Sequence, residues 1–308
     1  MKRKSLLLTL SFVLVLSMFI AACGKTDDAA KGDSDGKPVP GGKVTLAMFS
    51  APKGLFSSTF YEDQYDAYVL NYTEAGLWTY DDKLQLNVPI LAEKWELAED
   101  GKSVTIQLRK DAKWSDGEPI TVDDFIFAWE TIASENYTKE AKGPRYYAVE
   151  NIVGAKEVHE GKADSLSGVE KKDDYTVVVN FVEATANALD NLWSTPMPKH
   201  IFEGMTAVEM KNSDHVKKAD KIVSSGPFKF KEIKPNEYVI LERNEHWYEE
   251  GKPYLDEIHL KVMAQDVAVG ALKNGQIDFL SDIAPSEFDT IKKMDHVTIE
   301  ENQRCDYN

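Results

Sequence analysis

From residue 43 onward the sequence mixes two hydrophobic periods without strict alternation, and this mixture restricts the fold more than any other feature. Apolar residues at every second position predict strands, and apolar residues three or four apart predict helices. The predicted strands cover residues 43–49, 94–97, 103–108, 174–183, 228–233, 238–243, 257–263, 276–280 and 296–300. The predicted helices cover residues 61–76, a segment after Thr121, 187–193, 266–273 and 286–293. We therefore expect a mixed α/β fold.

Turn and cap residues support several of these elements. Asp100-Gly101 and Pro235-Asn236 are typical of tight turns between paired strands. Thr121 can cap the helix that follows it, and Gly76 suits the end of the helix over 61–76. Residues 174–183 are apolar on both faces, which predicts a buried position within a sheet.

The first residues have the pattern of an export signal. Three basic residues, Lys2 to Lys4, precede the uncharged run Leu6 to Ile20, which is short for a membrane span of roughly 20 residues. Ile20-Ala21-Ala22-Cys23 resembles the lipobox of bacterial lipoproteins. The resemblance implies a signal peptide over 1–22, acylation of Cys23 and anchoring on the extracellular face of a Gram-positive-type cell membrane. An ordinary signal peptide cleaved nearby is the alternative.

Residues 23–42 hold mostly Gly, Asp, Lys, Ser and Pro, so we expect a flexible tether there. If Cys23 carries lipid, Cys305 has no partner within the chain, and the fold depends on its hydrophobic core. The 36 basic and 52 acidic residues give a formal charge of −16, which disfavours nucleic acid as a partner.

Sequence patterns of catalysis and cofactor binding are absent. The chain has no GxxxxGK[ST] or GxGxxG motif, and its six histidines include no HExxH pair. Its one GxSxG string, residues 32–36, falls in the polar stretch 23–42 and not between a strand and a helix, so it is no nucleophile elbow. The acidic doublets Asp81-Asp82, Asp123-Asp124 and Asp173-Asp174 fall at predicted turns and a helix start, where capping and solvation explain them. We expect a protein that is not an enzyme and that needs neither cofactor nor metal.

Two ordered blocks of residues carry a family resemblance. The first comprises 91–96, 99–102, 108–110, 113–121 (KWSDGEPIT) and 123–125, and the second comprises 225–228 (SGPF), 241–244 (LERN), 251–258 and 271–278. In order and spacing they resemble the extracellular solute-binding proteins of the oligopeptide and dipeptide class, which serve ABC importers. The resemblance extends over residues 43–280.

The resemblance implies a two-lobed periplasmic-binding-protein-like fold of the peptide-binding type. An extended oligopeptide lies between the lobes, pairs through its backbone, and is passed to an ABC permease by a monomeric receptor. The residues it places near the ligand are Ser57, Ser58, Phe60, Tyr61, Glu62, Trp193, Ser194, Ser224, Ser225 and Gly226. The family's usual Leu-Asp-Pro in the first loop is replaced here by Gly54-Leu55-Phe56.

The same resemblance divides the chain. Residues 43–275 correspond to lobe I, with a core of 43–75 plus 171–275 and an inserted subdomain over 76–170. Residues 276–308 correspond to the start of a truncated lobe II, so only the first lobe is largely present. We therefore expect this chain by itself to bind peptide weakly or not at all.

Other functions remain open at this point. The same scaffold could bind a signalling peptide, a nickel complex or haem. A role as an envelope adhesin or chaperone is a further alternative, and an enzyme is the least favoured.

Overall fold

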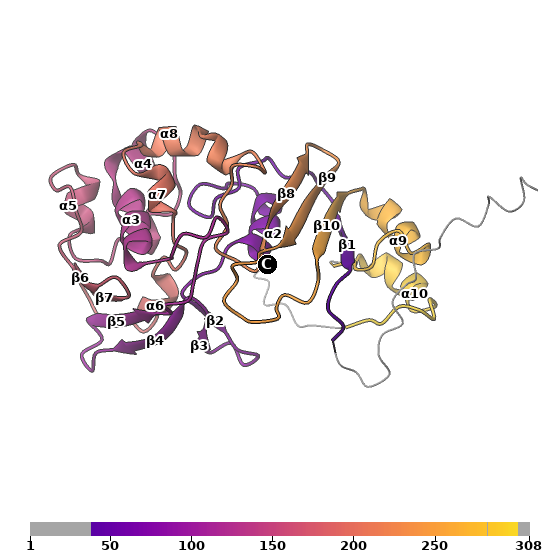
Figure 1. Ribbon diagram of the computed structural model, residues 1–308, viewed down its shortest axis with the longest axis horizontal. Coiled ribbons are helices and arrows are strands. Elements are labelled where there is room, and N and C mark those ends of the chain that lie inside the picture. The colour runs from indigo at the N-terminus through magenta and orange to yellow at the C-terminus, as the bar shows by residue number, and fades with distance from the viewer. Residues whose placement is uncertain (1–37, 282, 301–308) are drawn as a thin grey trace, which may run out of the picture. The chain divides into compact units, whose positions relative to one another are not determined.

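The computed structural model describes residues 38–281 and 283–300 (Figure 1). Every described helix and strand lies within residues 41–300. The predicted signal peptide, Cys23, most of the predicted tether and Cys305 lie outside the described residues. Among the described helices, none has the length and apolar character that a bilayer crossing requires.

The first of two four-stranded sheets has the order β1-β10-β9-β8. Its strands are β1 (Lys43–Met48), β10 (Glu257–Val262), β9 (Tyr238–Arg243) and β8 (Phe228–Lys234). Strand β1 runs parallel to β10, whereas β9 is antiparallel to both β10 and β8. Helix α2 (Gln64–Thr73) covers one face, and Leu46, Leu241 and Leu260 are buried beneath it. The predicted hairpin between β8 and β9 is confirmed, with Asn236 in the left-handed region (φ 62°).

The second sheet has the order β4-β5-β7-β6 and is antiparallel throughout. Its strands are β4 (Ala92–Leu97), β5 (Ser103–Leu108), β7 (Thr176–Asn180) and β6 (Val169–Asp173). Val104, Ile106, Val177 and Val179 point into a core closed by helix α3 (Val122–Ala133). As predicted, Thr121 begins this helix, in a capping box with Asp124.

Strand β7 pairs with β5, although the predicted division of the chain places these two strands in different parts of lobe I. Residues 171–180 were assigned to the lobe core, but their backbone groups bond to strands of the predicted subdomain. The boundary at residue 170 is therefore wrong as a sheet boundary, because a hairpin cannot be divided between two sheets without breaking its ladder. The rest of the predicted division stays a prediction.

Shorter elements complete the fold, and the first two of them pair antiparallel as a separate two-stranded sheet. They are β2 (Trp78–Tyr80), β3 (Leu86–Pro89), α4 (Glu135–Lys139), η1 (Tyr146–Ala148), α5 (Ala155–His159), α6 (Ala188–Asn191), α7 (Lys199–Phe202), α8 (Ala207–Asn212) and η2 (Asp214–Val216). Helix α2 ends at Thr73, three residues before the predicted cap Gly76, because Glu74 is already extended and Gly226 donates its N–H to the Thr73 carbonyl at 2.9 Å.

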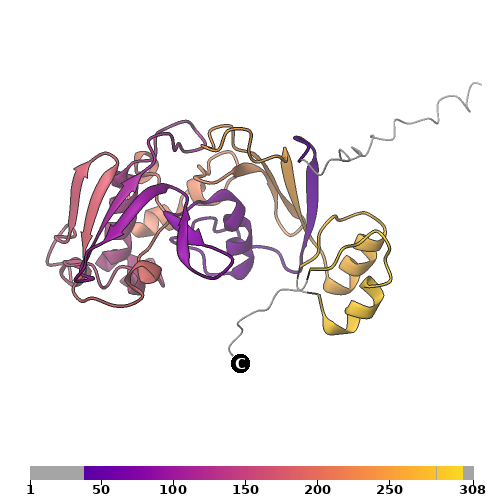
Figure 2. The same ribbon diagram turned by 90° about the horizontal axis from the view of Figure 1, so that it is seen from below.

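The last described residues form a helical group beside β1 (Figures 1 and 2). It comprises α9 (Gln265–Lys273), η3 (Pro285–Glu287) and α10 (Phe288–Ile291), and the apolar side chains of α9 and α10 pack with Ala47. The predicted strands 276–280 and 296–300 are wrong. The former makes only a single bridge, Leu46 to Phe279, and the latter is irregular. The Asp278 carboxylate accepts the Thr45 N–H at 2.7 Å, so this N–H is not available to a backbone carbonyl of a strand over 276–280.

Candidate functional site

The loop between β1 and α2 contains five of the predicted ligand residues, and it is folded back on itself. The Ser57 carbonyl accepts the N–H groups of Phe60 (2.9 Å) and Tyr61 (2.8 Å). Ser57 and Phe60 are only 8% and 1% exposed, so their side chains face the interior. Ser58 and Tyr61 are partly exposed and Glu62 is exposed. The loop therefore leaves Tyr61 and Glu62 accessible, whereas the Ser58 side chain is directed to the buried Glu74 carboxyl.

Glu74, the residue that follows α2, holds this loop from one side. The Ser58 N–H donates to both oxygens of its carboxylate, at 3.1 and 3.3 Å. Burial raises the pKa of Glu74 from 4.5 to about 7, although the Ser58 hydrogen bonds and the nearby Arg145 charge act in the opposite direction. The loop thus rests on a carboxyl group that changes charge near neutral pH.

Arg145 holds the loop from the other side. Its guanidinium donates to the carbonyls of Tyr61 (2.8 Å) and Thr59 (3.3 Å). The Tyr137 hydroxyl donates to the same Thr59 carbonyl at 2.7 Å. Arg145 is 6% exposed, and its charge lies 4.1 Å from the centre of the Tyr61 ring and 5.7 Å from the Trp193 ring. Sequence reasoning missed Arg145, because nothing in its neighbourhood in the chain points to residues 59–61.

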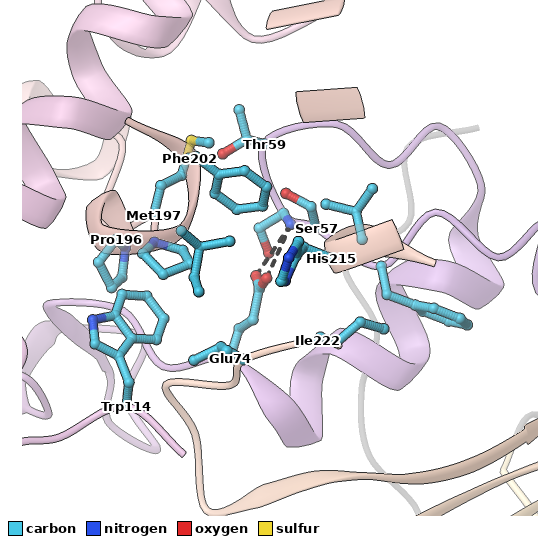
Figure 3. A pocket seen from close by; sticks show the side chains of 15 residues that line it. Ser57, Thr59, Glu74, Trp114, Pro196, Met197, Phe202, His215 and Ile222 are labelled. Carbon is cyan, nitrogen blue, oxygen red and sulfur yellow. Dashed lines mark hydrogen bonds between the residues drawn. The ribbon is translucent and has the colours of Figure 1, made fainter. Parts of the chain in front are cut away.

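A small cavity separates the loop from the segments around Trp114 and Met197. Figure 3 shows the Glu74 carboxylate reaching toward the loop, with Trp114 and Pro196 on one side and His215 on the other. The space open to the centre of a water molecule is about 20 Å³, enough for one or two waters. A peptide side chain does not fit there, so this cavity is part of the support for the loop.

Ser224, Ser225 and Gly226 form a packed junction between the two sheets. The Ser225 hydroxyl accepts the Ala75 N–H (2.9 Å) and donates to the Ala75 carbonyl (3.3 Å). Ser224 exchanges two hydrogen bonds with Ser115. A Cβ atom on Gly226 would lie 2.7 Å from the Thr73 carbonyl carbon. All three residues are buried, so the structure gives them a packing role, and their contact with ligand stays a prediction.

Trp193 and Ser194 are partly exposed and lie on the Arg145 side of the loop. The Trp193 carbonyl accepts the Trp129 Nε1–H at 2.7 Å, and the Ser194 carbonyl accepts the Leu77 N–H at 2.9 Å. A hollow of about 460 Å³ adjoins this segment and is lined by Tyr146, Tyr147, Phe181, Val182 and Leu192 among others. The structure thus brings Tyr61 and Trp193 to one guanidinium, and it buries Ser225 and Gly226 against Ala75 and Thr73, the residues that flank Glu74.

Glu62 follows Tyr61 on the loop and pairs with Lys211 across 2.6 Å. The Lys211 hydrogen bond and charge lower the pKa of Glu62. Among residues 38–281 and 283–300, no three His, Cys, Asp or Glu side chains gather closely enough to hold a metal ion.

Comparison with known proteins agrees with the resemblance seen in the sequence. The family described as bacterial extracellular solute-binding proteins, family 5, matches residues 87–307. The oligopeptide-binding protein AppA of Bacillus subtilis is 31% identical over 303 residues, which cover 97% of this chain and 51% of AppA. The periplasmic oligopeptide-binding protein OppA of Escherichia coli is 30% identical over 211 residues, which cover 67% of this chain and 37% of OppA.

Solved structures give the same result. AppA from Bacillus subtilis in complex with a nonapeptide has a TM-score of 0.71 at 29% identity, covering 84% of this chain and 47% of AppA. Lactococcal OppA with an endogenous peptide, in the closed conformation, has a TM-score of 0.72 at 26% identity, covering 82% and 48%. The chain spans about half the length of AppA. With the family matched over most of its length, the chain belongs to family 5 of the bacterial extracellular solute-binding proteins.

Proposed function

We propose that this chain supplies one side of the ligand site in an oligopeptide receptor, which is anchored to the membrane through Cys23 and delivers peptides to an ABC importer. The observation that carries the proposal is the match to AppA in complex with a nonapeptide, with a TM-score of 0.71 over 84% of this chain. The receptor holds its ligand without making or breaking bonds.

The chemistry available around the loop suits a peptide. Tyr61 on the loop and Trp193 beside the same guanidinium are partly exposed aromatic residues, and Ser58 and Ser194 are partly exposed next to them in the chain. Aromatic side chains bury large areas against a ligand while they lose little conformational entropy. Hydrogen bonds to a peptide backbone are independent of the ligand's side chains, so such a site accepts many sequences. We propose that the partly exposed residues Ser58, Tyr61, Trp193 and Ser194 contact the ligand.

Native mass spectrometry of the chain after incubation with a mixture of peptides and free amino acids tests binding. Because the chain spans about half the length of AppA, we expect weak complexes, populated only at millimolar peptide, with peptides of several residues and none with single amino acids. A spectrum without peptide adducts at millimolar peptide would contradict the proposed site.

The anchor is tested separately in a bacterial host that processes lipoproteins. Labelled palmitate is expected to be incorporated into the wild-type chain and not into Cys23→Ser. The variant should also move from the membrane fraction to the soluble exported fraction. An equally labelled Cys23→Ser variant would exclude Cys23 as the anchor.

A further inference from the structure

The two partly exposed aromatic residues of the proposed site meet at one buried cation. Tyr61 comes from the loop that follows the first strand of the first sheet, and Trp193 comes from the segment after α6. Arg145 lies 4.1 Å from the Tyr61 ring centre and 5.7 Å from the Trp193 ring centre. Arg145 is only 6% exposed, so the charge near these two rings is covered by protein.

The hydrogen bonds of Arg145 determine where the loop backbone lies. The Tyr61 carbonyl accepts one guanidinium N–H at 2.8 Å and the Thr59 carbonyl accepts another at 3.3 Å. A planar guanidinium orients two acceptors at once, which a lysine ammonium cannot reproduce. Two carbonyls on alternate residues are therefore fixed relative to a single rigid group.

The surroundings of Arg145 offset the cost of burying its charge. The Glu62 carboxylate interacts with it, and so does Glu74 in its ionised form, above a pKa of about 7. The two carbonyl acceptors and the Tyr61 ring face replace the water that a guanidinium loses on burial. A buried charge with this many partners resists displacement, so it can hold the loop in one position.

We propose that Arg145 is a positioning residue of the peptide site, which sets the separation of Tyr61 and Trp193 by holding the Thr59 and Tyr61 carbonyls. This rests on the proposed function as far as the ligand is concerned, whereas the effect on the loop does not depend on it. Preorganised contact surfaces strengthen binding because the entropy of ordering the loop is lost during folding and not during binding.

Hydrogen exchange by mass spectrometry or NMR tests the effect on the loop in the full chain. In Arg145→Met, the amides of Phe60 and Tyr61 are expected to lose protection by about tenfold or more, since a hydrogen bond from a charged donor is lost. Amides in β5 and β9 should change by less than about threefold. Arg145→Lys keeps the charge and should not restore loop protection, because an ammonium group lacks the planar pair of N–H donors that reaches both carbonyls.

Arg109→Met is the matched control. Arg109 also stacks on a tyrosine, with its charge 3.5 Å from the Tyr248 ring centre, and it pairs with Asp111, but it has no contact with residues 57–62. Its loss should leave exchange in the loop unchanged. Full loop protection in both Arg145 variants would overturn the proposal. If Arg145→Met does not fold, Arg145→Lys alone decides the question.

Peptide affinity separates this inference from the proposed function. If the wild-type chain binds a nonapeptide, the dissociation constant is expected to rise at least about fivefold in Arg145→Lys and to stay constant in Arg109→Met. If the wild-type chain binds no peptide, the proposed function fails, while the exchange data still decide the role of Arg145. An unchanged affinity in Arg145→Lys, with peptide bound by the wild type, would contradict the positioning role.

Discussion

Replacing Glu74 with Gln should change the pH dependence of stability more than any other single substitution at this site. In the folded chain burial raises the pKa of Glu74 from 4.5 to about 7. Below pH 4.5 the carboxyl group is protonated in both the folded and the unfolded chain, and its full contribution to stability is present. Between pH 4.5 and about 7 the unfolded chain releases the proton and the folded chain retains it, so this contribution is lost as pH rises.

The size of the effect follows from the two pKa values. At about 1.4 kcal/mol per pH unit, the interval from 4.5 to about 7 corresponds to at most ~3.5 kcal/mol of unfolding free energy. Glutamine stays neutral and can still accept the Ser58 N–H. Relative to the wild type, Glu74→Gln is therefore expected to gain most of that amount between pH 5 and pH 8.

Urea unfolding followed by tryptophan fluorescence, at several pH values between 5 and 8, measures this difference. The control is Glu62→Gln, because the Lys211 hydrogen bond and charge lower the pKa of Glu62 and its titration falls below this range. The stability gap between Glu62→Gln and the wild type should stay constant from pH 5 to 8. A gap between Glu74→Gln and the wild type that is equally constant would refute the argument that Glu74 titrates near neutrality inside the fold.

Three further predictions concern packing. Gly226→Ala should lower the unfolding free energy by about 1–3 kcal/mol, because the new Cβ would lie 2.7 Å from the Thr73 backbone. Gly270→Ala in α9, where a Cβ would meet nothing within 4 Å, should raise the unfolding free energy by up to ~1 kcal/mol. Urea titrations that rank the two variants the other way would contradict the close approach of Gly226 to Thr73. Leu260→Ala should cost about 2–5 kcal/mol, since Leu260 is fully buried between α2 and the first sheet, and a loss under 1 kcal/mol would argue against that core. Asp278→Ala removes the acceptor of the Thr45 N–H and should cost about 1–3 kcal/mol and speed proteolysis within residues 276–300; an unchanged cleavage rate would speak against Asp278 as the tie to β1.

Several elements were predictable because their signals are local. Asp100-Gly101 joins β4 to β5 where the turn pattern predicts it, and Thr121 begins α3. The end of α2 was misplaced because the contact that ends it is non-local, from Gly226 to Thr73. The strand over 276–280 was wrong for the same reason, because Asp278 bonds to Thr45 across more than two hundred residues.

The candidate site was predictable only in part. The loop at 57–62 and the segment at Trp193 were identified through the family resemblance, and the fold does bring Tyr61 and Trp193 to a common neighbour. That neighbour, Arg145, was not predicted, and neither was the raised pKa of Glu74. Three of the predicted residues, Ser224 to Gly226, turn out to be buried at the sheet junction. A family motif marks positions under constraint without distinguishing packing from ligand contact.

By itself the sequence determined the mixed α/β class, most of the strands and the family, because periodicity, turn residues and motifs are properties of short segments. Only the tertiary structure decided which sheet each strand joins, which loop groups face outward, and which charges are buried together. Those features depend on contacts between residues far apart in the chain, such as Thr59 with Arg145 and Ser58 with Glu74. Burial in such contacts, and not residue type alone, raises the pKa of Glu74 to about 7. Burial also places the Arg145 guanidinium where it donates to the carbonyls of the loop.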